Sequence, residues 1–363
     1  MKPLDLVCYT FLSRDLSLKG RIQEVGGVIY YESRHSGIVS AMVPRRELRR
    51  LLEDPQLIFA EAEQQVALPP PKVIEIFPSK SGRKRVRSTQ QILPWNIKQV
   101  WRGSPYSRGG KGVRIGVLDT GIDLTHPDLS ANIKGGINLV TPGKLPHDDN
   151  GHGTHIAGII AARDNRLGVV GVAPSASLYA IKVLDKRGMG TLTSLIHGID
   201  WGIDNGMHIL NLSLSGGRTV SAGLARAIQA ATNRGILVVV AAGNSGNASG
   251  SGDTVQVPGR LPSVVAVAAL TRKNRRASFS STGPSLDISA PGVNITSTYT
   301  GGRYAIFSGT SQAAPHVTGV AAIFKQQGLS AYAIRRRLIL RAIPLGPTRL
   351  YGAGLVQSKR KQR

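Results

Sequence analysis

The sequence is short of cysteine, of aromatic residues and, beyond its first quarter, of glutamate. Its 363 residues include a single cysteine, Cys8, so no disulfide can form within the chain. Aromatic residues make up 5% of the total, and no apolar run is long enough to cross a membrane. No glutamate follows Glu75. These absences exclude a fold built on internal disulfides and a membrane-spanning helix.

Acidic residues are scarcest where basic residues are most abundant. Residues 1–90 hold 15 Lys and Arg against 10 Asp and Glu, whereas residues 91–363 hold 31 against 11. An excess of this size attracts anionic polymers or acidic peptides at low ionic strength. No motif of interleaved basic and aromatic residues accompanies it. Solubility or an alkaline-adapted surface is therefore the simpler interpretation, and no specific nucleic-acid partner is predicted.

Glycine is plentiful, and it surrounds three polar residues that stand far apart in the chain. Asp119 follows the apolar run 113–118, which is typical of a buried parallel strand. His152 lies in Gly-His-Gly-Thr-His, ahead of small apolar residues that suit a packed helix. Ser311 opens a helix predicted over 313–325, whose N-terminus favours a developing anion. A serine hydroxyl needs a base, and the base needs an orienting carboxylate, so these three residues indicate nucleophilic catalysis.

A fourth polar residue ends another predicted strand. The run 235–243 delivers Asn244 to the carboxyl edge of the sheet, where ligands of open α/β sheets bind. An amide N–H there can stabilise the oxyanion of a tetrahedral intermediate. His155 and His316 lie inside the same motifs and are assigned to packing and supporting hydrogen bonds. A single Asp, His or Ser in such a setting is more often a helix cap, a turn residue or a structural residue. The four candidates together indicate a serine peptidase.

The three motifs, in the order Asp, His, Ser, resemble those of the subtilisin-like (S8, subtilase) serine peptidases. The resemblance implies a three-layer α/β domain around a mostly parallel sheet. It also implies that Ser311 attacks the peptide bond of a protein substrate and that His152 moves the proton. Asp119 would then orient His152, and Asn244 would hold the oxyanion. Two alternatives stay open: a peptide-binding regulator without turnover, and an esterase or other acyl transferase on the same scaffold.

The resemblance also implies where a substrate lies. An extended peptide would insert between two strands of the enzyme, which match Ser213, Leu214, Ser215 and Gly216 on one side and the segment between Gly188 and Gly190 on the other. Ala241, Ala242 and Gly243 would form a wall of the main specificity pocket. Small residues there suit a large hydrophobic side chain before the cut bond. Ser215 stands where subtilisins usually carry glycine, a change expected to narrow or polarise the pocket entrance.

A structural calcium site is implied as well. Its ligands would be the side chains of Gln91, Asp128 and Asn165 and the backbone carbonyls of Arg163, Leu167 and Val169. Oxygen ligands gathered from separate segments suit Ca²⁺ better than a transition metal. The alternative is that Asp128 and Asn165 serve only as hydrogen-bonding residues of their loops.

A domain boundary is predicted near residue 90. Before it, the hydrophobic pattern predicts an amphipathic helix over 45–53 and strands over 4–12, 25–31, 36–43 and 57–62. Cys8 is expected to be a buried small hydrophobe of the first strand. Residues 1–65 are similar to the inhibitor-like prodomain of subtilases, which implies an intramolecular inhibitor. An unrelated small α+β module is the alternative.

Residues 66–89 are interpreted as a processing linker, because prolines are followed by a polar, basic stretch. One cut is predicted between Gln64 and Gln91, and residues 90–363 are assigned to the peptidase domain. The first 20 residues lack the apolar core of a signal peptide, which favours a cytoplasmic enzyme. A prodomain and a calcium site are more usual in secreted relatives, so secretion is the alternative. A monomer is expected, made as a self-inhibited precursor.

Overall fold

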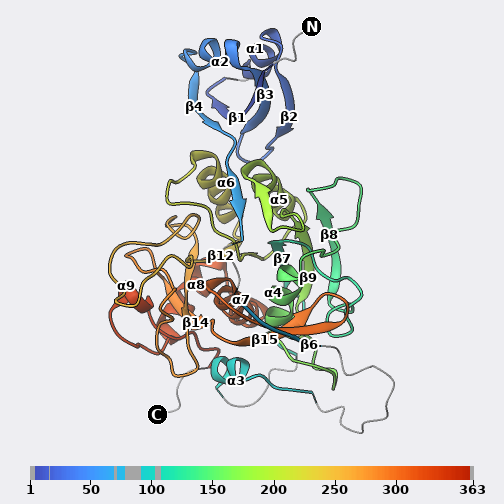
Figure 1. Cartoon of the computed structure of the whole chain (residues 1–363), viewed down its shortest axis with the longest axis vertical. Coiled ribbons are helices and arrows are strands. Elements are labelled where there is room, and N and C mark those ends of the chain that lie inside the picture. Colours follow the sequence, from blue (N-terminus) through green and yellow to red (C-terminus); the bar gives the residue numbers. More distant parts are fainter. Residues whose placement is uncertain (1–4, 16, 69–71, 78–90, 103–107, 360–363) are drawn as a thin grey trace.

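The computed structural model describes residues 5–15, 17–68, 72–77, 91–102 and 108–359. A small N-terminal unit, residues 5–62, stands on a much larger domain, residues 91–359 (Figure 1). Among the helices in these ranges, none is long and apolar enough to span a membrane.

A seven-stranded sheet forms the middle layer of the large domain. Its order is β14-β13-β12-β11-β7-β9-β8, and all six neighbouring pairs are parallel. The strands are short and mostly apolar, as parallel strands covered on both faces must be. They are β7 (Arg114–Asp119), β8 (Ile133–Asn138), β9 (Ser177–Lys182), β11 (Ile209–Leu212), β12 (Leu237–Ala241), β13 (Val265–Leu270) and β14 (Ile288–Pro291).

Alternate side chains of these strands belong to two different cores. In β12, Leu237 and Val239 pack into one buried cluster, and Val238 and Val240 pack into the other. The first cluster includes α3 (Trp95–Trp101), α4 (His152–Ala161), α7 (Thr310–Gln326) and α8 (Ala331–Arg341). The second includes α5 (Leu192–Asp204) and α6 (Ala222–Asn233), which face the N-terminal unit in Figure 1. Helices therefore cover both faces of the sheet, and the three-layer prediction is confirmed.

Helix α7 differs from its sequence-based prediction at its start. It begins at Thr310 rather than at 313, directly after Gly309, so Ser311 lies within its first turn. Thr310 and Ser311 have modest helix propensity, which hides this start in the sequence. Residues 310–324 are all buried, so the helix is held by tertiary packing and not by propensity.

The N-terminal unit is a four-stranded antiparallel sheet in the order β2-β3-β1-β4. Its own apolar core includes Phe11, Ile22, Val43 and Leu51. The predicted strands and the helix over 45–53 are present, with ends shifted by a few residues. The elements are β1 (Leu6–Ser13), α1 (Leu18–Glu24), β2 (Val28–Glu32), β3 (Val39–Pro44), α2 (Arg45–Leu52) and β4 (Leu57–Ala62).

Two features of this unit differ from prediction. Helix α1 is absent from the predicted elements, because Leu18 and Ile22 are its only two buried residues and Gly20 lowers its helix propensity. Cys8 is exposed, not buried. Phe11 of the same strand faces the apolar core, and side chains alternate along a strand, so Cys8 points to the opposite face.

Residues 66–89 are not a continuous linker. Strand β5 (Gln65–Ala67) pairs antiparallel with β10 (Met189–Thr191). Strand β6 (Lys72–Phe77) pairs antiparallel with β16 (Arg303–Ser308), which also pairs with β15 (Ile295–Tyr299). The linker interpretation overlooked that Lys-Val-Ile-Glu-Ile-Phe is rich in strand-forming residues. Residues 69–71 and the basic stretch 79–88 lie outside the described residues.

Candidate active site

Three elements deliver the predicted catalytic side chains to the carboxyl edge of the parallel sheet. Asp119 is the last residue of β7, His152 is the first residue of α4, and Ser311 lies in the first turn of α7. Their exposed fractions are 0%, 1% and 2%. The fold thus gathers at one edge three residues that span nearly two hundred positions in the sequence.

Asp119 and His152 form a direct, buried pair. Nδ1 of His152 lies 2.8 Å from Oδ1 and 3.0 Å from Oδ2 of Asp119. A carboxylate in this position favours the tautomer that carries its proton on Nδ1, which leaves Nε2 free to accept a proton. Oδ1 of Asp119 also accepts the backbone N–H of Thr120 at 2.8 Å. The pair has the geometry of an oriented general base.

Ser311 is not hydrogen-bonded to His152 in this structure. Its Oγ donates to the backbone carbonyl of Ser213 at 2.8 Å, and Ser213 Oγ donates to the carbonyl of Ser311 at 2.9 Å. A hydroxyl turns to whichever acceptor is nearby, and catalytic hydrogen bonds are often formed only once substrate is bound. The structure therefore places the nucleophile and the base on adjacent elements without joining them.

Asn244 has its amide oriented by a neighbour of the nucleophile. Oδ1 of Asn244 accepts both the backbone N–H of Thr310 at 2.9 Å and its hydroxyl at 2.8 Å. These bonds fix the oxygen on one side, so Nδ2 is left as the donor on the other side. Thr310 is a residue that the sequence did not single out, although its place next to Ser311 was a usable signal.

The predicted substrate groove contains a segment of the same chain. Strand β5 lies between β10 and residue Ser215, pairing Gly190 with Val66 and bridging Ser215 to Ala67. The backbone N–H of Ser215 donates to the Ala67 carbonyl at 3.3 Å, and that of Leu68 donates to the Gly188 carbonyl at 2.9 Å. Residues 64–68 thus bind as an added strand. Sequence reasoning placed the end of the N-terminal unit here but did not identify this strand.

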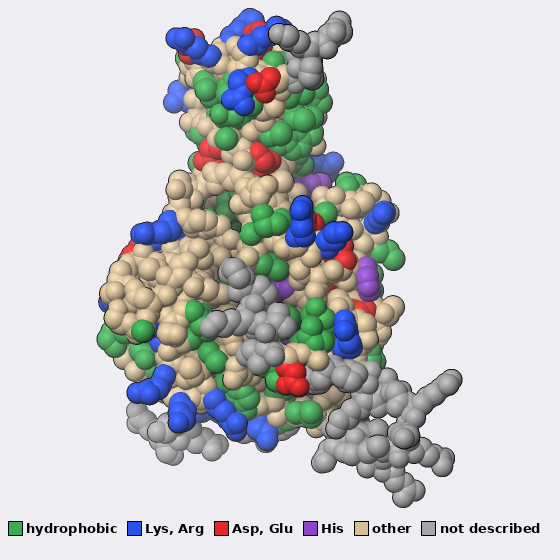
Figure 2. Space-filling model, in the orientation of Figure 1, with side chains coloured by type: hydrophobic (Ala, Val, Ile, Leu, Met, Phe, Trp, Pro, Cys, Tyr) green, Lys and Arg blue, Asp and Glu red, His purple; other side chains and the backbone are tan. Residues whose placement is uncertain are grey.

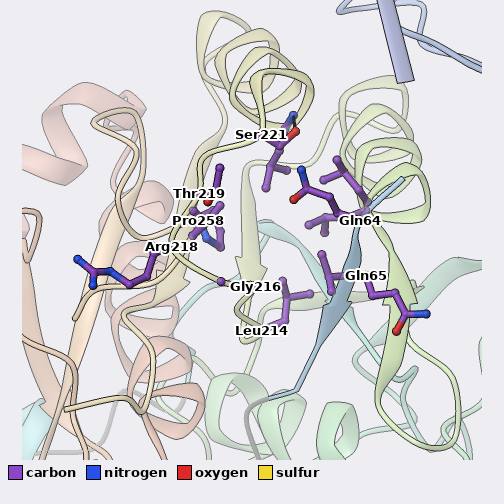
Figure 3. A pocket seen from close by; sticks show the side chains of 14 residues that line it. Gln64, Gln65, Leu214, Gly216, Arg218, Thr219, Ser221 and Pro258 are labelled. Carbon is purple, nitrogen blue, oxygen red and sulfur yellow. Dashed lines mark hydrogen bonds between the residues drawn. The ribbon is translucent and has the colours of Figure 1, made fainter. Parts of the chain in front are cut away.

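A cavity of about 340 Å³ lies beside β5. Figure 3 shows β5 with Gln64 and Gln65 on one side and the segment from Leu214 to Thr219 on the other. The wall of this cavity is largely aliphatic and is formed by Val66, Leu192, Leu195, Leu214, Leu224 and Val257. A pocket of this kind next to a strand-binding groove suits an apolar side chain of an extended peptide.

The predicted pocket wall is buried but is not wholly apolar. Ala241, Ala242 and Gly243 end β12 and begin the turn to Asn244, and none of the three is accessible. The side chain of Gln256 occupies the space that a side chain on Gly243 would need, and its Oε1 accepts a 3.0 Å hydrogen bond from Ser215 Oγ. Gln256 carries no motif that would have revealed it. Together with Ser215 it places a polar pair at this pocket.

The predicted calcium ligands come together from three segments. Gln91 Nε2 lies 2.5 Å from the carbonyl oxygen of Arg163 and 3.2 Å from that of Val169. Asn165 Nδ2 lies 3.2 Å from Oδ1 of Asp128. Oδ2 of Asp128 accepts from the backbone N–H of Val169 at 3.0 Å and from the Tyr304 hydroxyl at 2.8 Å. Leu167 belongs to the same loop, and its N–H donates to Asn165 Oδ1 at 2.9 Å.

His155 and His316 occupy supporting positions, as the sequence indicates. His155 Nε2 lies 3.1 and 3.2 Å from the carbonyls of Ile295 and Ala305, and His316 Nδ1 lies 2.8 Å from that of Gln312. Burial lowers the pKa of His155 to about 3 and that of His316 to about 4. Both imidazoles are therefore neutral in the folded protein at ordinary pH.

Comparison with known proteins identifies the family of the chain. Residues 110–354 match the model of the subtilase family. The chain is 43% identical over 336 residues to a thermostable alkaline protease of Halalkalibacterium halodurans, covering 92% of this chain and 85% of that protein. It is 50% identical over 273 residues to subtilisin BL of Lederbergia lenta, covering 74% and 98%. For subtilisin E of Bacillus subtilis the identity is 40% over 343 residues, covering 93% and 84%. The chain therefore belongs to the subtilase family of serine endopeptidases.

Proposed function

We propose that this endopeptidase is made as a self-inhibited precursor and cuts proteins after large hydrophobic residues through an acyl-enzyme intermediate. The observation that carries the proposal is β5, which binds as a strand in the groove where a substrate would bind. A precursor held in this way keeps its nucleophile covered until the segment leaves.

The proposed reaction assigns one role to each of four residues. Ser311 attacks the scissile carbonyl while His152 takes the hydroxyl proton and later gives it to the leaving amine. Asp119, hydrogen-bonded to Nδ1 of His152, stabilises the imidazolium that forms. Asn244 Nδ2 and the backbone N–H of Ser311 would hold the oxyanion. Water then hydrolyses the acyl-enzyme by the same proton transfers in reverse.

Two glutamates support the proposal that residues 1–65 act as an inhibitor. Glu61 accepts the Ser221 hydroxyl and the Ala222 N–H, both at 2.7 Å, at the N-terminus of α6. Glu63 accepts the Thr193 N–H at 3.1 Å at the N-terminus of α5. Figure 2 shows acidic side chains gathered where the N-terminal unit meets the large domain. A carboxylate at a helix N-terminus satisfies free N–H groups and the helix dipole together.

Strand β6 extends the inhibitory region beyond residue 65. It pairs with β16, the strand that leads directly into α7 and Ser311, through a register that includes Phe307 with Val73 and Ser308 with Lys72. The chain is thus held at two places on the large domain, by β5 on β10 and by β6 on β16. We infer that a cut beyond residue 77 alone leaves the inhibitor in place.

A preference for large hydrophobic residues is supported by the small side chains of Ala241, Ala242 and Gly243. Glycine and alanine leave room for a bulky side chain, and a buried apolar wall favours an apolar one. The polar pair formed by Ser215 and Gln256 lies at the same pocket. We therefore expect large residues that carry one polar atom, such as Tyr, to be accepted beside Leu and Phe.

We also propose a structural Ca²⁺ site at Gln91, Asp128, Asn165 and the 163–169 loop. Two backbone carbonyls converge on the Gln91 amide group, and convergent carbonyl oxygens suit a cation. Turning that amide would add its oxygen to them. Among the described residues no three His, Cys, Asp or Glu side chains form a metal-binding group. A set with one carboxylate and several neutral oxygens fits Ca²⁺ and does not fit a transition metal.

One experiment tests the peptidase and precursor proposals together. Wild type and Ser311→Ala are incubated with unfolded casein and Ca²⁺, and casein fragments and the intact mass of the enzyme are followed in the same samples. We expect casein fragments in the wild type alone, and shortening of the wild type alone by a cut between Gln64 and Gln91.

The other outcomes separate the alternatives. Equal shortening of both proteins would show that an outside protease makes the cut, and self-processing would be wrong. A fluorogenic peptide panel and a simple ester are assayed in parallel. Cleavage of the ester alone would indicate an esterase. If the shortened protein cleaves neither the peptides nor the ester, it would be a regulator that binds peptides.

A further inference from the structure

A buried carboxylate outside the proposed catalytic set connects the loop after β7 to the start of α4. Asp148 is 2% exposed. Its Oδ1 accepts the Thr120 hydroxyl at 2.8 Å and the backbone N–H groups of Asn150 and Gly151 at 3.0 and 2.9 Å. Its Oδ2 accepts the backbone N–H and the hydroxyl of Thr154 at 2.9 and 2.6 Å. All five partners are donors, so both oxygens act as acceptors, which an ionised carboxylate does without conflict.

The two threonines extend the connection to both sides. Thr120 follows Asp119, and its hydroxyl oxygen also accepts the N–H of Gly153, next to His152, at 3.0 Å. The hydroxyl oxygen of Thr154 accepts the N–H of Asp123 at 2.9 Å. Hydrogen bonds therefore join residues 119–123 to residues 152–154 at two points, and Asp148 is the common partner. We refer to Thr120, Asp148 and Thr154 as the clamp.

The two segments that the clamp joins are in close contact. A side chain on Gly153 would meet the Gly121 carbonyl, and its Cβ would lie 3.2 Å from Oδ1 of Asp119. Helix α4 has no side-chain cap from its N-cap residue, Gly151. Asp148 instead accepts the N–H of Thr154 in the first turn and that of Gly151 at the N-cap, and it places a negative charge at the positive end of the helix. The start of α4 is therefore held by Asp148 together with Thr120, which accepts the N–H of Gly153.

We propose that the clamp positions the general base by setting the geometry of the Asp119–His152 hydrogen bond. Asp119 ends a strand and His152 begins a helix, so the 2.8 Å contact between them depends on how these separate elements are held. The three clamp residues are buried, so the clamp acts through Asp119 and His152. This inference rests on the roles proposed for those two residues.

A pair of substitutions at one position separates positioning from general destabilisation. Thr120→Val keeps the shape of the side chain and removes both hydroxyl hydrogen bonds, whereas Thr120→Ser keeps the hydroxyl. Because a misplacement of about 1 Å can cost roughly a hundredfold in rate, we expect kcat of Thr120→Val to fall by about ten- to a hundredfold with KM little changed. Thr120→Ser should stay within about threefold of the wild type.

Two further readouts accompany the kinetics. The ¹H NMR resonance of the Nδ1 proton of His152 should move in Thr120→Val and stay in place in Thr120→Ser. Thr282→Val serves as a matched control, because Thr282 is also buried and donates one hydrogen bond, to the Gly252 carbonyl at 3.0 Å. It should lower the melting temperature and leave kcat unchanged.

Each result decides the proposal. Wild-type kcat and an unmoved resonance in Thr120→Val would make the positioning role wrong, even if the melting temperature falls. A kcat lost equally in Thr120→Val and Thr282→Val would also contradict it. Should Thr120→Val not fold, Thr154→Val takes its place, because it removes both hydrogen bonds of the Thr154 hydroxyl. If the wild type itself cleaves no peptide, the proposed function fails, while the resonance still reports on the clamp.

Discussion

The N-terminal unit and the large domain bury their side chains in different ways. The core of the N-terminal unit is apolar, and most of its ion pairs, for example Lys19 with Glu32 and Arg45 with Asp5, lie on its surface. The large domain buries Asp119, Asp148 and His152 together at one edge of its sheet. The comparison teaches that charged groups lie mainly on the surface of one unit and are gathered in the interior of the other.

The distribution of glutamate follows the same division. All glutamates lie within residues 1–75. Glu61 and Glu63 accept hydrogen bonds from the N-termini of two helices of the large domain. The large domain, which has 31 Lys and Arg against 11 Asp and Glu beyond residue 90, supplies no glutamate of its own. Glutamates of the N-terminal part thus contact a domain in which basic residues outnumber acidic ones.

The sharpest way to break this docking is the double change Glu61→Gln and Glu63→Gln. Hydrogen bonds to charged groups contribute about 1.5–3 kcal/mol each, so losing two charges should weaken docking by at least about a hundredfold. We expect the uncut precursor to cleave a fluorogenic peptide correspondingly faster than the unchanged precursor does. Initial rates are measured while intact mass shows that the chain is still whole.

A matched control uses the same chemical change on the same unit. Glu47 and Glu53 lie on and next to α2, and their carboxylates contact Arg46 and Arg49 and not the large domain. Glu47→Gln with Glu53→Gln should therefore leave the precursor inhibited. If both double variants are equally inhibited, the helix-terminal carboxylates do not hold the inhibitor.

A second test uses pH and acts on the interior of the large domain. His155 and His316 have folded pKa values lowered by burial to about 3 and about 4, against about 6.5 when unfolded. The unfolded chain therefore binds more protons between these values. Above a pH of about 6.5 the two histidines do not lower the free energy of unfolding. Below that pH the free energy of unfolding falls by about 1.4 kcal/mol per pH unit for each histidine.

The measurement is the free energy of unfolding of Ser311→Ala from pH 7.5 down to pH 5. All three tryptophans, Trp95, Trp101 and Trp201, belong to the large domain, so their fluorescence reports its unfolding. Adding His316→Gln should reduce the loss of stability per pH unit by about 1.4 kcal/mol. An unchanged slope would contradict the neutral, buried state of His316.

The same contrast explains what the sequence could predict. In the large domain, apolar runs ending in Asp119 and Asn244 predicted both the strands and their functional ends. In the N-terminal unit, hydrophobic periodicity predicted the strands and α2. Both successes rest on local pattern, because a buried strand or an amphipathic helix is recorded in consecutive residues.

What escaped prediction depends on partners far away in the chain. Helix α1 is held by two buried side chains, and Cys8 is exposed because of the face that it occupies. Strand β5 pairs with β10, a partner that no local pattern in its three residues records, whereas the strand-forming residues of β6 were a local signal without a visible partner. The orientation of Asn244 by Thr310 and the polar contact between Ser215 and Gln256 are likewise tertiary. The sequence therefore did not reveal which strands pair, how the Asn244 side chain is oriented, or which side chains are in contact.

A third test concerns the proposed Ca²⁺ site, whose predicted ligands all lie in the large domain. Ligand bound only to the folded state stabilises it by about 2.7 kcal/mol at a free concentration of 100 times Kd. We expect excess EDTA to lower the melting temperature of Ser311→Ala by several degrees and added Ca²⁺ to restore it. Asp128→Asn should abolish this difference, whereas Asp164→Asn should keep it, because Asp164 is not among the proposed ligands. A melting curve indifferent to EDTA would favour the alternative that Asp128 and Asn165 only hold their loops together. Tryptophan fluorescence should report the whole shift, since the N-terminal unit has no tryptophan and no part in the site.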